Sequence, residues 1–522
     1  MKNGKWLWTL LIFGMLSGVF ADGQPVDKEK FDEAAWKKQV EELKAQDMAD
    51  ADVQLRLGLL LLQDKSDKSV EHQKEGFELL KKSADQGNSS ALFQVAKCYR
   101  EGKGTGRDDA LAYECFRQVA DDEGAKEYLD ATFHVGMCLL EGLGVAKDAD
   151  SAIEWIREAA DNGFVPAQYQ MGMINIKGEV ATHNLEQAIQ YFQKAAEQEH
   201  VESQVILGII LINEDIVKDR QTEGMKWLLK AAGNGHVIAQ LIVGYAYLTG
   251  DGVEKDEAKA VLWFEKAAKQ GDADGCFNLG VCLVNGMGVA KDEKHGFECF
   301  VKAKEFGSLR AFAAIGKCYM GGRGVEKNVR KGFETFKEGA LKNDVWCQFE
   351  LSQCYYVGRG TEKDEGMEFY WVKCAADNGL PDAINNLGDC YEKGRGIEKD
   401  YAMALKYYRE AQALGVPIAW CSLGECYEKG LGVEKNYQKA VELYNEAIKR
   451  GSFEAYVTLG RCHENGTGVE KNGAKAVELY KQAAEKEVTD AYAALARCYE
   501  QGVGVEKNAE EAKKWRDKLL ED

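Results

Sequence analysis

Proline and histidine are scarce in this chain of 522 residues, which contains only four prolines and seven histidines. The shortage of proline permits long stretches of helix, because proline breaks the hydrogen bonding of a helix interior. Positive charge is also in deficit, since 67 lysines and arginines face 86 acids and the formal net charge is −19. Such a surface repels phosphate backbones and anionic lipid headgroups, so we expect neither nucleic acid nor a membrane surface as a ligand.

Motifs for catalysis and metal binding are missing from the sequence. It contains no S-x-x-K, G-x-S-x-G, H-E-x-x-H, C-x-x-C or H-x-x-x-H. A serine nucleophile of the penicillin-binding kind needs a lysine one helical turn further on, and a zinc site needs closely spaced thiols or imidazoles. The glycine-rich run at Gly102 lacks the strand and the GK[ST] of a phosphate loop. We therefore expect no catalytic residue, no metal and no cofactor.

Long apolar runs are absent except near the N-terminus. There, two lysines precede an uncharged apolar run from Trp6 to Phe20, and Val19 and Ala21 suit the −3 and −1 positions of a cleavage site. A run of this length is short for a membrane span and typical of a secretory signal. We expect residues 1–21 to be a signal peptide, with an uncleaved anchor as the alternative. The mature protein should then be periplasmic or secreted, or lumenal in the endoplasmic reticulum of a eukaryote, and have no membrane span.

The chain is instead rich in repetition, which is the first feature to seek in a long sequence. A small residue that follows Leu, Val, Met or Ile returns every 36 residues. It is found at Gly136, Gly172, Gly208, Gly244, Gly280, Gly316, Ser352, Gly388, Gly424, Gly460 and Ala496, with looser copies at Gly58 and Ala96. We call it the marker residue of its repeat, and thirteen repeats span residues 50–522.

The copy from Pro417 to Ser452 shows what one repeat contains. Apolar residues recur at helical spacing, a Gly430-x-Gly432 turn follows, and a second apolar helix begins after the N-cap candidate Asn436. The same N-cap position holds Asp148, Asp256, Asp292, Asp364 and Asp400 in other copies. The pattern predicts a helix–turn–helix hairpin, and because a single hairpin cannot bury its apolar face, neighbouring hairpins must stack.

We therefore predict an all-α fold, a right-handed α-solenoid of about 13 helix–turn–helix repeats of 36 residues. Residues 22–49 are expected to form a linker and a capping helix that covers the first repeat. The last repeat ends in the polar segment KKWRDKLLED, which is typical of a helix that caps the other end. Two turns, at residues 177–184 and 213–220, lack the G-x-G, and a binding feature could have been introduced there.

The repeat resembles the Sel1-like repeat family, whose pattern contains L-G, a G-x-G-V-x-K-[DN] turn and a second helix with A-x-x-[WY] and A-A-x-x-G. One copy matches this pattern at Gly250, Gly252, Val253, Lys255, Asp256, Ala260, Trp263, Ala267, Ala268 and Gly271. Ten of the thirteen copies keep the G-x-G turn, and the resemblance covers about nine-tenths of the chain. Tetratricopeptide repeats differ, because their period is 34 residues.

The resemblance implies a scaffold that holds other proteins on a superhelical surface. Exported bacterial members of the family meet host or envelope partners, and a lumenal eukaryotic member serves protein degradation from the endoplasmic reticulum. We therefore expect an exported, monomeric adaptor that binds a protein or a peptide. Cysteine-rich bacterial relatives are associated with penicillin binding, so a penicillin-binding or weak β-lactamase-like enzyme is the alternative. The missing S-x-x-K argues against it.

Nine of the fifteen cysteines occupy one position, two residues after the marker residue. That position lies on the predicted buried stripe of the first helix, where a thiol behaves as a small apolar group. Equivalent Cα atoms of stacked helices lie about 10 Å apart, beyond the roughly 7 Å that a disulfide can span, so these cysteines cannot form a ladder of bridges. The Cys-x7-Cys spacing of the cysteine-rich relatives does not occur here. Two pairs at a 17-residue offset, Cys98 with Cys115 and Cys282 with Cys299, are candidate disulfides.

The exposed face of the first helices is the candidate binding surface. At 100° per residue, the positions three before, one after and four after the marker residue point outward. In repeats three to seven these positions are apolar or aromatic, and the predicted contact residues are Phe133, Met137, Tyr169, Met173, Ile209, Leu241, Tyr245, Leu248, Phe277 and Val281. The alternative is that curvature buries them between hairpins. In repeats ten to thirteen the same positions are largely acidic, among them Glu392, Glu428 and Glu464, which would favour a ligand with a basic part.

Overall fold

The computed structural model describes residues 33–65, 69–178, 184–213, 216–217 and 219–521. These residues form 27 helices and no strand, which confirms the predicted all-α fold. The chain divides into two compact units, and the division falls inside α14 (Glu257–Lys269). Unit 1 is residues 1–266 and unit 2 is residues 267–522. The predicted signal peptide and the irregular parts of the two turns without G-x-G lie outside the described residues.

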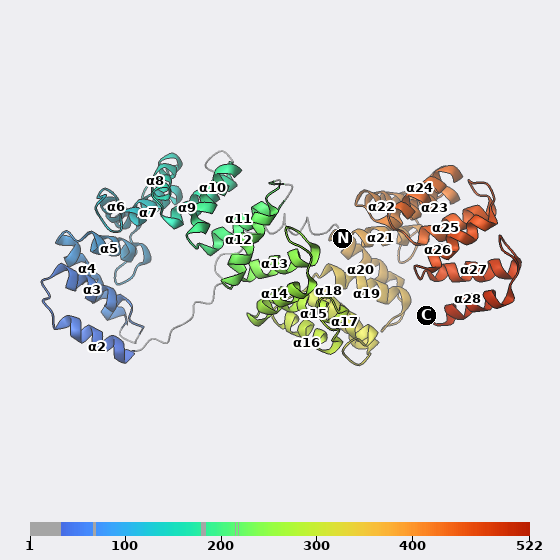
Figure 1. Cartoon of the computed structure of the whole chain (residues 1–522), viewed down its shortest axis with the longest axis horizontal. Helices are drawn as coiled ribbons and strands as arrows, with labels where there is room; N and C mark the ends of the chain where they lie inside the picture. The colour runs from blue at the N-terminus through green and yellow to red at the C-terminus, as the bar shows by residue number, and fades with distance from the viewer. Residues whose placement is uncertain (1–32, 66–68, 179–183, 214–215, 218, 522) are drawn as a thin grey trace. The chain divides into compact units, whose positions relative to one another are not determined.

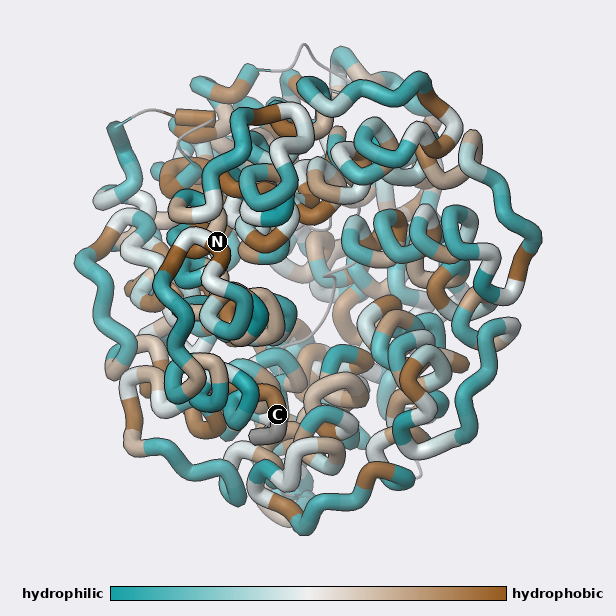
Figure 2. The backbone as a smooth tube through the Cα atoms, turned by 90° about the vertical axis from the view of Figure 1, so that its right-hand side faces the viewer, coloured by the Kyte–Doolittle hydropathy of each residue, from teal (hydrophilic) through white to brown (hydrophobic). Residues whose placement is uncertain are grey.

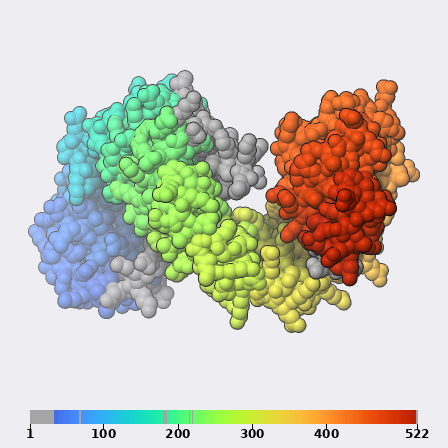
Figure 3. Space-filling model, turned by 45° about the vertical axis from the view of Figure 1, so that its right-hand side comes forward, coloured from blue at the N-terminus to red at the C-terminus, as the bar shows by residue number. Residues whose placement is uncertain are grey.

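Within each unit the helices pair into hairpins that follow one another in chain order (Figure 1). The colours of the space-filling view run in the same order along each unit (Figure 3). Repeat 1 is the hairpin of α3 and α4, and repeat 13 is the hairpin of α27 and α28. The hairpins of unit 1 are α3 (Ala51–Leu62) with α4 (Ser69–Asp85), α5 (Ser89–Glu101) with α6 (Asp109–Ala120), α7 (Tyr128–Glu141) with α8 (Ala149–Asp161), α9 (Val165–Lys177) with α10 (Leu185–Glu197), α11 (Val201–Ile212) with α12 (Gln221–Gly233), and α13 (Val237–Thr249) with α14.

The hairpins of unit 2 have the same pattern of a first and a second helix of about equal length. They are α15 (Ala273–Asn285) with α16 (Glu293–Glu305), α17 (Arg310–Gly321) with α18 (Val329–Leu341), α19 (Val345–Val357) with α20 (Glu365–Asp377), α21 (Pro381–Lys393) with α22 (Tyr401–Ala413), α23 (Pro417–Lys429) with α24 (Tyr437–Lys449), α25 (Glu454–Asn465) with α26 (Gly473–Ala484), and α27 (Thr489–Gln501) with α28 (Ala509–Glu521). Polar and apolar segments alternate along the helices (Figure 2), as expected for helices buried on one side.

The second helices begin at the predicted N-caps. The Oδ1 of Asn436 accepts a hydrogen bond of 2.9 Å from the backbone N–H of Lys439, and this satisfies one of the free donors of the first turn. The aspartates at this position form the same bond in their own repeats, namely Asp148, Asp256, Asp292, Asp364 and Asp400. The N-cap prediction is confirmed.

The marker residue is small because the second helix of its own hairpin packs against it. A Cβ atom at Gly244 would lie 2.5 Å from Cε1 of Phe264, twenty residues further on. Phe264 is fully buried, and Phe116, Phe192 and Phe336 are equally well buried at the same place in other repeats. The glycine therefore permits the close approach of the two helices that lets an aromatic ring fill the centre of the hairpin.

An additional helix covers the first hairpin of unit 1, and α28 closes the last hairpin of unit 2 as its second helix. In unit 1, α2 (Glu33–Lys44) lies on repeat 1, where the Nε1 of Trp36 donates a 2.9 Å hydrogen bond to the carbonyl oxygen of Leu60. Leu43 of the same helix is buried against the cluster of Leu57 and Leu61. In unit 2, the ring of Trp515 in α28 stacks on Tyr492, with centroids 5.8 Å apart.

The nine cysteines that follow the marker residue are all buried, as predicted. All fifteen lie within the described residues, and the structure forms no disulfide among them. The candidate pairs Cys98–Cys115 and Cys282–Cys299 are therefore not bridged in this structure. Burial raises the pKa of the Cys98 thiol to about 11, which leaves it protonated and weakly nucleophilic at neutral pH.

We expect a thiol reagent to modify about two cysteines per chain under native conditions, Cys115 and Cys374, because they alone are half-buried and the rest are buried. After denaturation without reductant, all fifteen should react. The measurement is a thiol count before and after denaturation, repeated with a reductant. Thiols that appear only after reduction would reveal disulfides and contradict this expectation.

Candidate interaction surface

The predicted contact residues lie on the first helices, and most of them are partly accessible. In unit 1 the half-buried ones are Phe133, Met137, Tyr169, Met173, Leu241, Tyr245 and Leu248. In unit 2, Phe277 and Val281 of α15 are also half-buried. We call the seven residues of unit 1 the apolar strip. Each side chain of the strip offers part of its surface to solvent and part to the protein.

The buried part of the apolar strip packs against the second helix of its own hairpin and against the next repeat. The ring of Phe133 lies 5.6 Å from that of Phe164, which precedes α9. Met137 packs on the same cluster, which includes Met171 and Ile174 of α9. Tyr169 in turn lies with its ring 6.0 Å from Phe192 and 5.1 Å from His200. Stacking therefore holds the strip in place and leaves only one side of each side chain available to a partner.

Ile209 corrects the prediction, because it is 1% exposed and cannot contact a partner. It belongs to a cluster that contains Ile242 and Val243 of α13. Its helix, α11, is apolar on nearly all sides and is buried from Ser203 to Ile212 except at Ile206. The prediction considered the directions of side chains on a single helix, and these place Ile209 toward solvent. In the structure the neighbouring hairpin covers it.

The acidic positions of unit 2 are also corrected by the structure, because their carboxylates are occupied. Glu392, Glu428 and Glu464 accept hydrogen bonds from the hydroxyls of buried tyrosines in the second helices of their own hairpins, Tyr408 at 2.9 Å, Tyr444 at 2.6 Å and Tyr480 at 2.8 Å. Arginines one repeat further on complete two of these networks, Arg461 at 3.6 Å from Glu428 and Arg497 at 2.7 Å from Glu464.

This tyrosine–glutamate pairing explains why the first-helix face changes from apolar to acidic. Where the second helix carries Phe264 or Leu228 at the centre of the hairpin, the residue four after the marker residue is Leu248 or Ile212. Where that central residue is Tyr444, the position holds Glu428, because the buried hydroxyl needs an acceptor. The acidic residues therefore stabilise their hairpins and do not form a free surface for a basic ligand.

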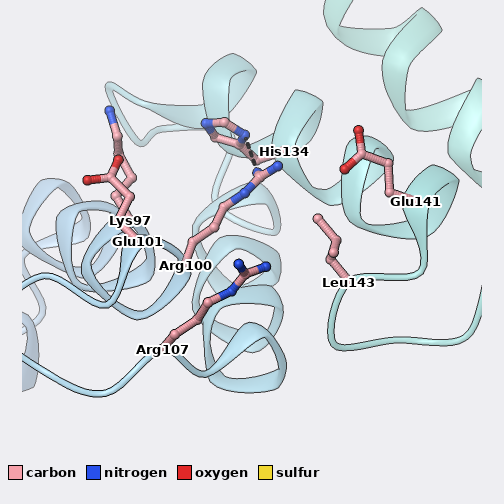
Figure 4. A pocket seen from close by; sticks show the side chains of 7 residues that line it. All are labelled: Lys97, Arg100, Glu101, Arg107, His134, Glu141 and Leu143. Atoms are coloured by element: carbon pink, nitrogen blue, oxygen red, sulfur yellow. Dashed lines mark hydrogen bonds between the residues drawn. The ribbon is translucent and has the colours of Figure 1, made fainter.

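A cavity of about 450 Å³ opens between repeats 2 and 3 of unit 1. Its lining comes from α5, α7 and the turns that follow them, and consists of Lys97, Arg100, Glu101, Arg107, His134, Glu141 and Leu143. Arg100 and Arg107 lie on one side, and Glu141 and Leu143 lie on the other (Figure 4). Three cations thus gather at one place in a strongly acidic chain, and we call this place the cationic cavity.

The two arginines of the cationic cavity have different partners. Arg107 forms a bidentate ion pair with Asp109, with its Nη2 2.9 Å from Oδ2. The Nη1 of Arg100 donates a 3.0 Å hydrogen bond to Nδ1 of His134 and forms no ion pair with a carboxylate among the described residues. Burial, assisted by Arg100 and Lys97, lowers the pKa of His134 to about 4, so the imidazole is neutral at pH 7 and can accept this bond.

Sequence reasoning missed the cationic cavity. Lys97 and Arg100 lie one and four residues after the marker residue Ala96, at the outward positions of repeat 2. The signal was available, because neighbouring repeats carry apolar residues at those positions. The prediction considered only the longer apolar and acidic runs of repeats three to seven and ten to thirteen.

Metal-ligating side chains do not cluster in the described part of the chain. No group of three His, Cys, Asp or Glu side chains there is placed to hold a metal ion. No helix described by the structure has both the length and the apolar character needed to cross a membrane.

Stacked hairpins with a partly exposed apolar strip define a helical-repeat protein. Thirteen segments of the chain match the model of the Sel1 repeat, at residues 51–88, 89–122, 129–164, 165–200, 201–236, 237–272, 273–306, 312–344, 347–380, 381–416, 419–452, 454–488 and 489–515. The chain belongs to the Sel1 repeat family. Repeat proteins of the Sel1 and tetratricopeptide-like kind generally mediate protein–protein interactions, and their fold is typically non-enzymatic.

A solved structure shows the same fold. The chain is similar to c5321, a protective antigen present in uropathogenic Escherichia coli strains and displaying an SLR fold, with 26% identity, 85% of this chain and 94% of that chain covered, and a TM-score of 0.62. A Sel1 repeat protein from Oxalobacter formigenes is 22% identical, with 69% of this chain and 92% of that chain covered and a TM-score of 0.44. No curated protein matches the sequence.

Proposed function

We propose that the protein is an exported, monomeric scaffold that binds a protein or peptide partner on the first-helix face of unit 1. The observation that supports this most strongly is the apolar strip, in which two tyrosines, two methionines, a phenylalanine and two leucines remain half-buried on three first helices. Partly exposed aromatic side chains dominate interface energies, and methionine adapts to irregular partners. A partner segment that is apolar or amphipathic suits such a surface.

Export is proposed from the sequence of the N-terminus. A basic start, an uncharged apolar run and small residues at Val19 and Ala21 are the features that support it. Cleavage after Ala21 would leave Asp22 as the first residue of the mature chain. We expect mass spectrometry of the protein from its own cell to give the mass of residues 22–522. The mass of an intact N-terminus would instead favour an anchor.

The proposed binding face is tested with peptides selected by the full chain from a random dodecapeptide library displayed on phage. We expect Tyr169→Ala and Tyr245→Ala each to reduce the binding free energy of the synthetic peptides by about 1–3 kcal/mol, because truncation removes aromatic contact surface. The measurement is fluorescence anisotropy, with circular dichroism to show that helicity is kept.

The matched control is Tyr437→Ala, because Tyr437 is 41% exposed at the start of α24, a second helix of unit 2, and is not part of the proposed face. It should leave affinity unchanged. Ile209→Ala serves as the opposite control, since this buried side chain should reduce stability by about 2–5 kcal/mol while the remaining folded protein still binds. Equal losses for Tyr169→Ala and Tyr437→Ala would contradict the proposed face.

A further inference from the structure

The cationic cavity has the features of a binding site for one negative charge. Among the residues that the structure describes, the neutral His134 is the only side chain that hydrogen-bonds the guanidinium of Arg100. Such a bond leaves the positive charge of Arg100 uncompensated, whereas Arg107 is neutralised by Asp109. A half-buried cation without a counter-ion strengthens its interaction with any anion that enters, because the surroundings screen it less than water does.

The other charges around the cavity limit which anion fits. Glu101 and Glu141 are exposed at its edge, and because Asp109 neutralises Arg107, they face the two remaining cations of the lining, Lys97 and Arg100. A doubly charged phosphoryl group would meet repulsion from both carboxylates. A carboxylate carries one charge, and its two oxygens match the paired donors of a guanidinium.

Apolar groups beside the cavity indicate what accompanies that carboxylate. Leu143 forms part of the lining itself. The ring of Phe133, the first residue of the apolar strip, lies 5.8 Å from the ring of His134. The cavity is therefore next to the apolar strip, and one ligand can reach both.

We propose that the cationic cavity binds a single carboxylate of a partner peptide through Arg100, while an apolar residue next to that carboxylate lies against Leu143 and Phe133. This rests on the proposed function, because it assigns a chemical group to a partner that the first-helix face of unit 1 already receives. The carboxylate belongs to an acidic side chain or to a free C-terminus, since both have the same charge and shape.

The test uses the dodecapeptides selected by the full chain. We expect the selected peptides to need an Asp or Glu, or a free C-terminus, beside an apolar residue. Arg100→Gln should lower the affinity of these peptides about tenfold or more, since a hydrogen bond between charged groups is lost. Replacing the peptide's acid by its amide, or amidating its C-terminus, distinguishes the two sources. The peptide change that removes the bound carboxylate should lower the affinity for the wild-type chain about as much as Arg100→Gln does. The same peptide change should lower the affinity for the Arg100→Gln variant little further.

The matched control is Lys317→Gln, because Lys317 also lies one residue after a marker residue but in repeat 8, where it pairs with Glu350 at 2.8 Å. It should leave affinity unchanged, whereas Lys97→Gln, at the edge of the cavity, should weaken binding about two- to fivefold.

A second readout is the His134 resonance in nuclear magnetic resonance spectra. His134 has Arg100 and Lys97 near it on α5 and Asp130 on its own helix. A carboxylate bound to Arg100 should raise its pKa from about 4.

The outcomes separate the two proposals. One outcome is that Tyr169→Ala lowers the affinity of the peptides, whereas Arg100→Gln, amidation of the C-terminus and replacement of the acid by its amide all leave it unchanged. This would overturn the carboxylate site and still support the binding face. Competition by inorganic phosphate at a concentration at which acetate has no effect would also overturn it, in favour of a phosphoryl ligand. Selection of no binding peptide at all would contradict both proposals.

Discussion

Arg395→Met is expected to lower the stability of unit 2 by about 3–5 kcal/mol, because it leaves Glu368 as a buried charge without a cationic partner. Glu368 is 4% exposed, and its Oε1 accepts a 3.0 Å hydrogen bond from Nε of Arg395. Arg395 also bonds Asp389, with Nη2 2.7 Å from Oδ2. Removal of the arginine thus breaks two charged hydrogen bonds at once.

Burial already raises the pKa of Glu368 even with Arg395 present. Its Oε2 and the nearby Nε1 of Trp371 have no hydrogen-bond partner among the described residues. Apart from Arg395, the only side chain among the described residues that hydrogen-bonds Glu368 is Cys390, whose Sγ lies 3.7 Å from Oε1 and is a weak donor that does not replace a guanidinium. Without Arg395, the carboxylate must remain charged in an apolar setting or take up a proton, and both are unfavourable at neutral pH.

The control is Arg359→Met, because Arg359 lies in the same place of the preceding G-x-G turn and is exposed. Its effect should be within about 0.5 kcal/mol. The double variant Glu368→Ala with Arg395→Met should regain most of the lost stability, since Ala404 and Ala440 occupy the equivalent position in repeats 10 and 11. Urea denaturation measures all three. A single variant Arg395→Met as stable as Arg359→Met would refute the argument.

The loss should also depend on pH. Above the usual pKa of glutamate the unfolded chain carries a carboxylate, and the folded Arg395→Met variant must either bury that charge or bind a proton. As the pH falls below that pKa, the unfolded chain becomes protonated too and the penalty disappears. The difference in stability between wild type and Arg395→Met should therefore shrink toward acid pH.

Much of the fold could be predicted from the sequence, because each repeat contains the same local sequence pattern, with the same capping and buried positions. Asn436 begins a helix through its own side chain, and Cys426 is buried because it lies two residues after Gly424 on a helix with one apolar side. These features depend on neighbours within a single hairpin. A pattern repeated thirteen times makes such local rules visible without any structure.

The surface could be predicted less well, because it depends on contacts between hairpins. Ile209 and Cys421 both occupy outward positions of their own helices, yet both are buried. The first helices of adjacent repeats meet there, and the Sγ of Cys421 lies 3.5 Å from Oγ1 of Thr458 in the next repeat. Glu368 shows the same limit, since it takes the place of an alanine and its partner Arg395 comes from the turn of the following repeat.

Gly324→Ala is the second substitution with a large expected effect, a loss of about 2–4 kcal/mol. Gly324 is the second glycine of the G-x-G turn in repeat 8 and has a φ of +68°. An L-residue in this left-handed region costs about 1–2 kcal/mol. A Cβ atom at Gly324 would also overlap the backbone carbonyl of Glu293, at the start of α16 in the preceding repeat. Backbone cannot move aside as a side chain can, so the turn and the helix must separate.

Gly307→Ala isolates the contribution of that overlap. Gly307 has a φ of +97°, and a Cβ atom there would meet nothing within 4 Å. It should therefore show only the conformational penalty of about 1–2 kcal/mol, and the difference between the two variants measures how tightly repeats 7 and 8 are joined. Because each repeat contacts chiefly its neighbours, hydrogen exchange should quicken in α16 to α18 and stay unchanged in α27 and α28. Equal losses for the two glycines, or a uniform increase in exchange across unit 2, would show that the G-x-G turn does not join consecutive repeats as the geometry implies.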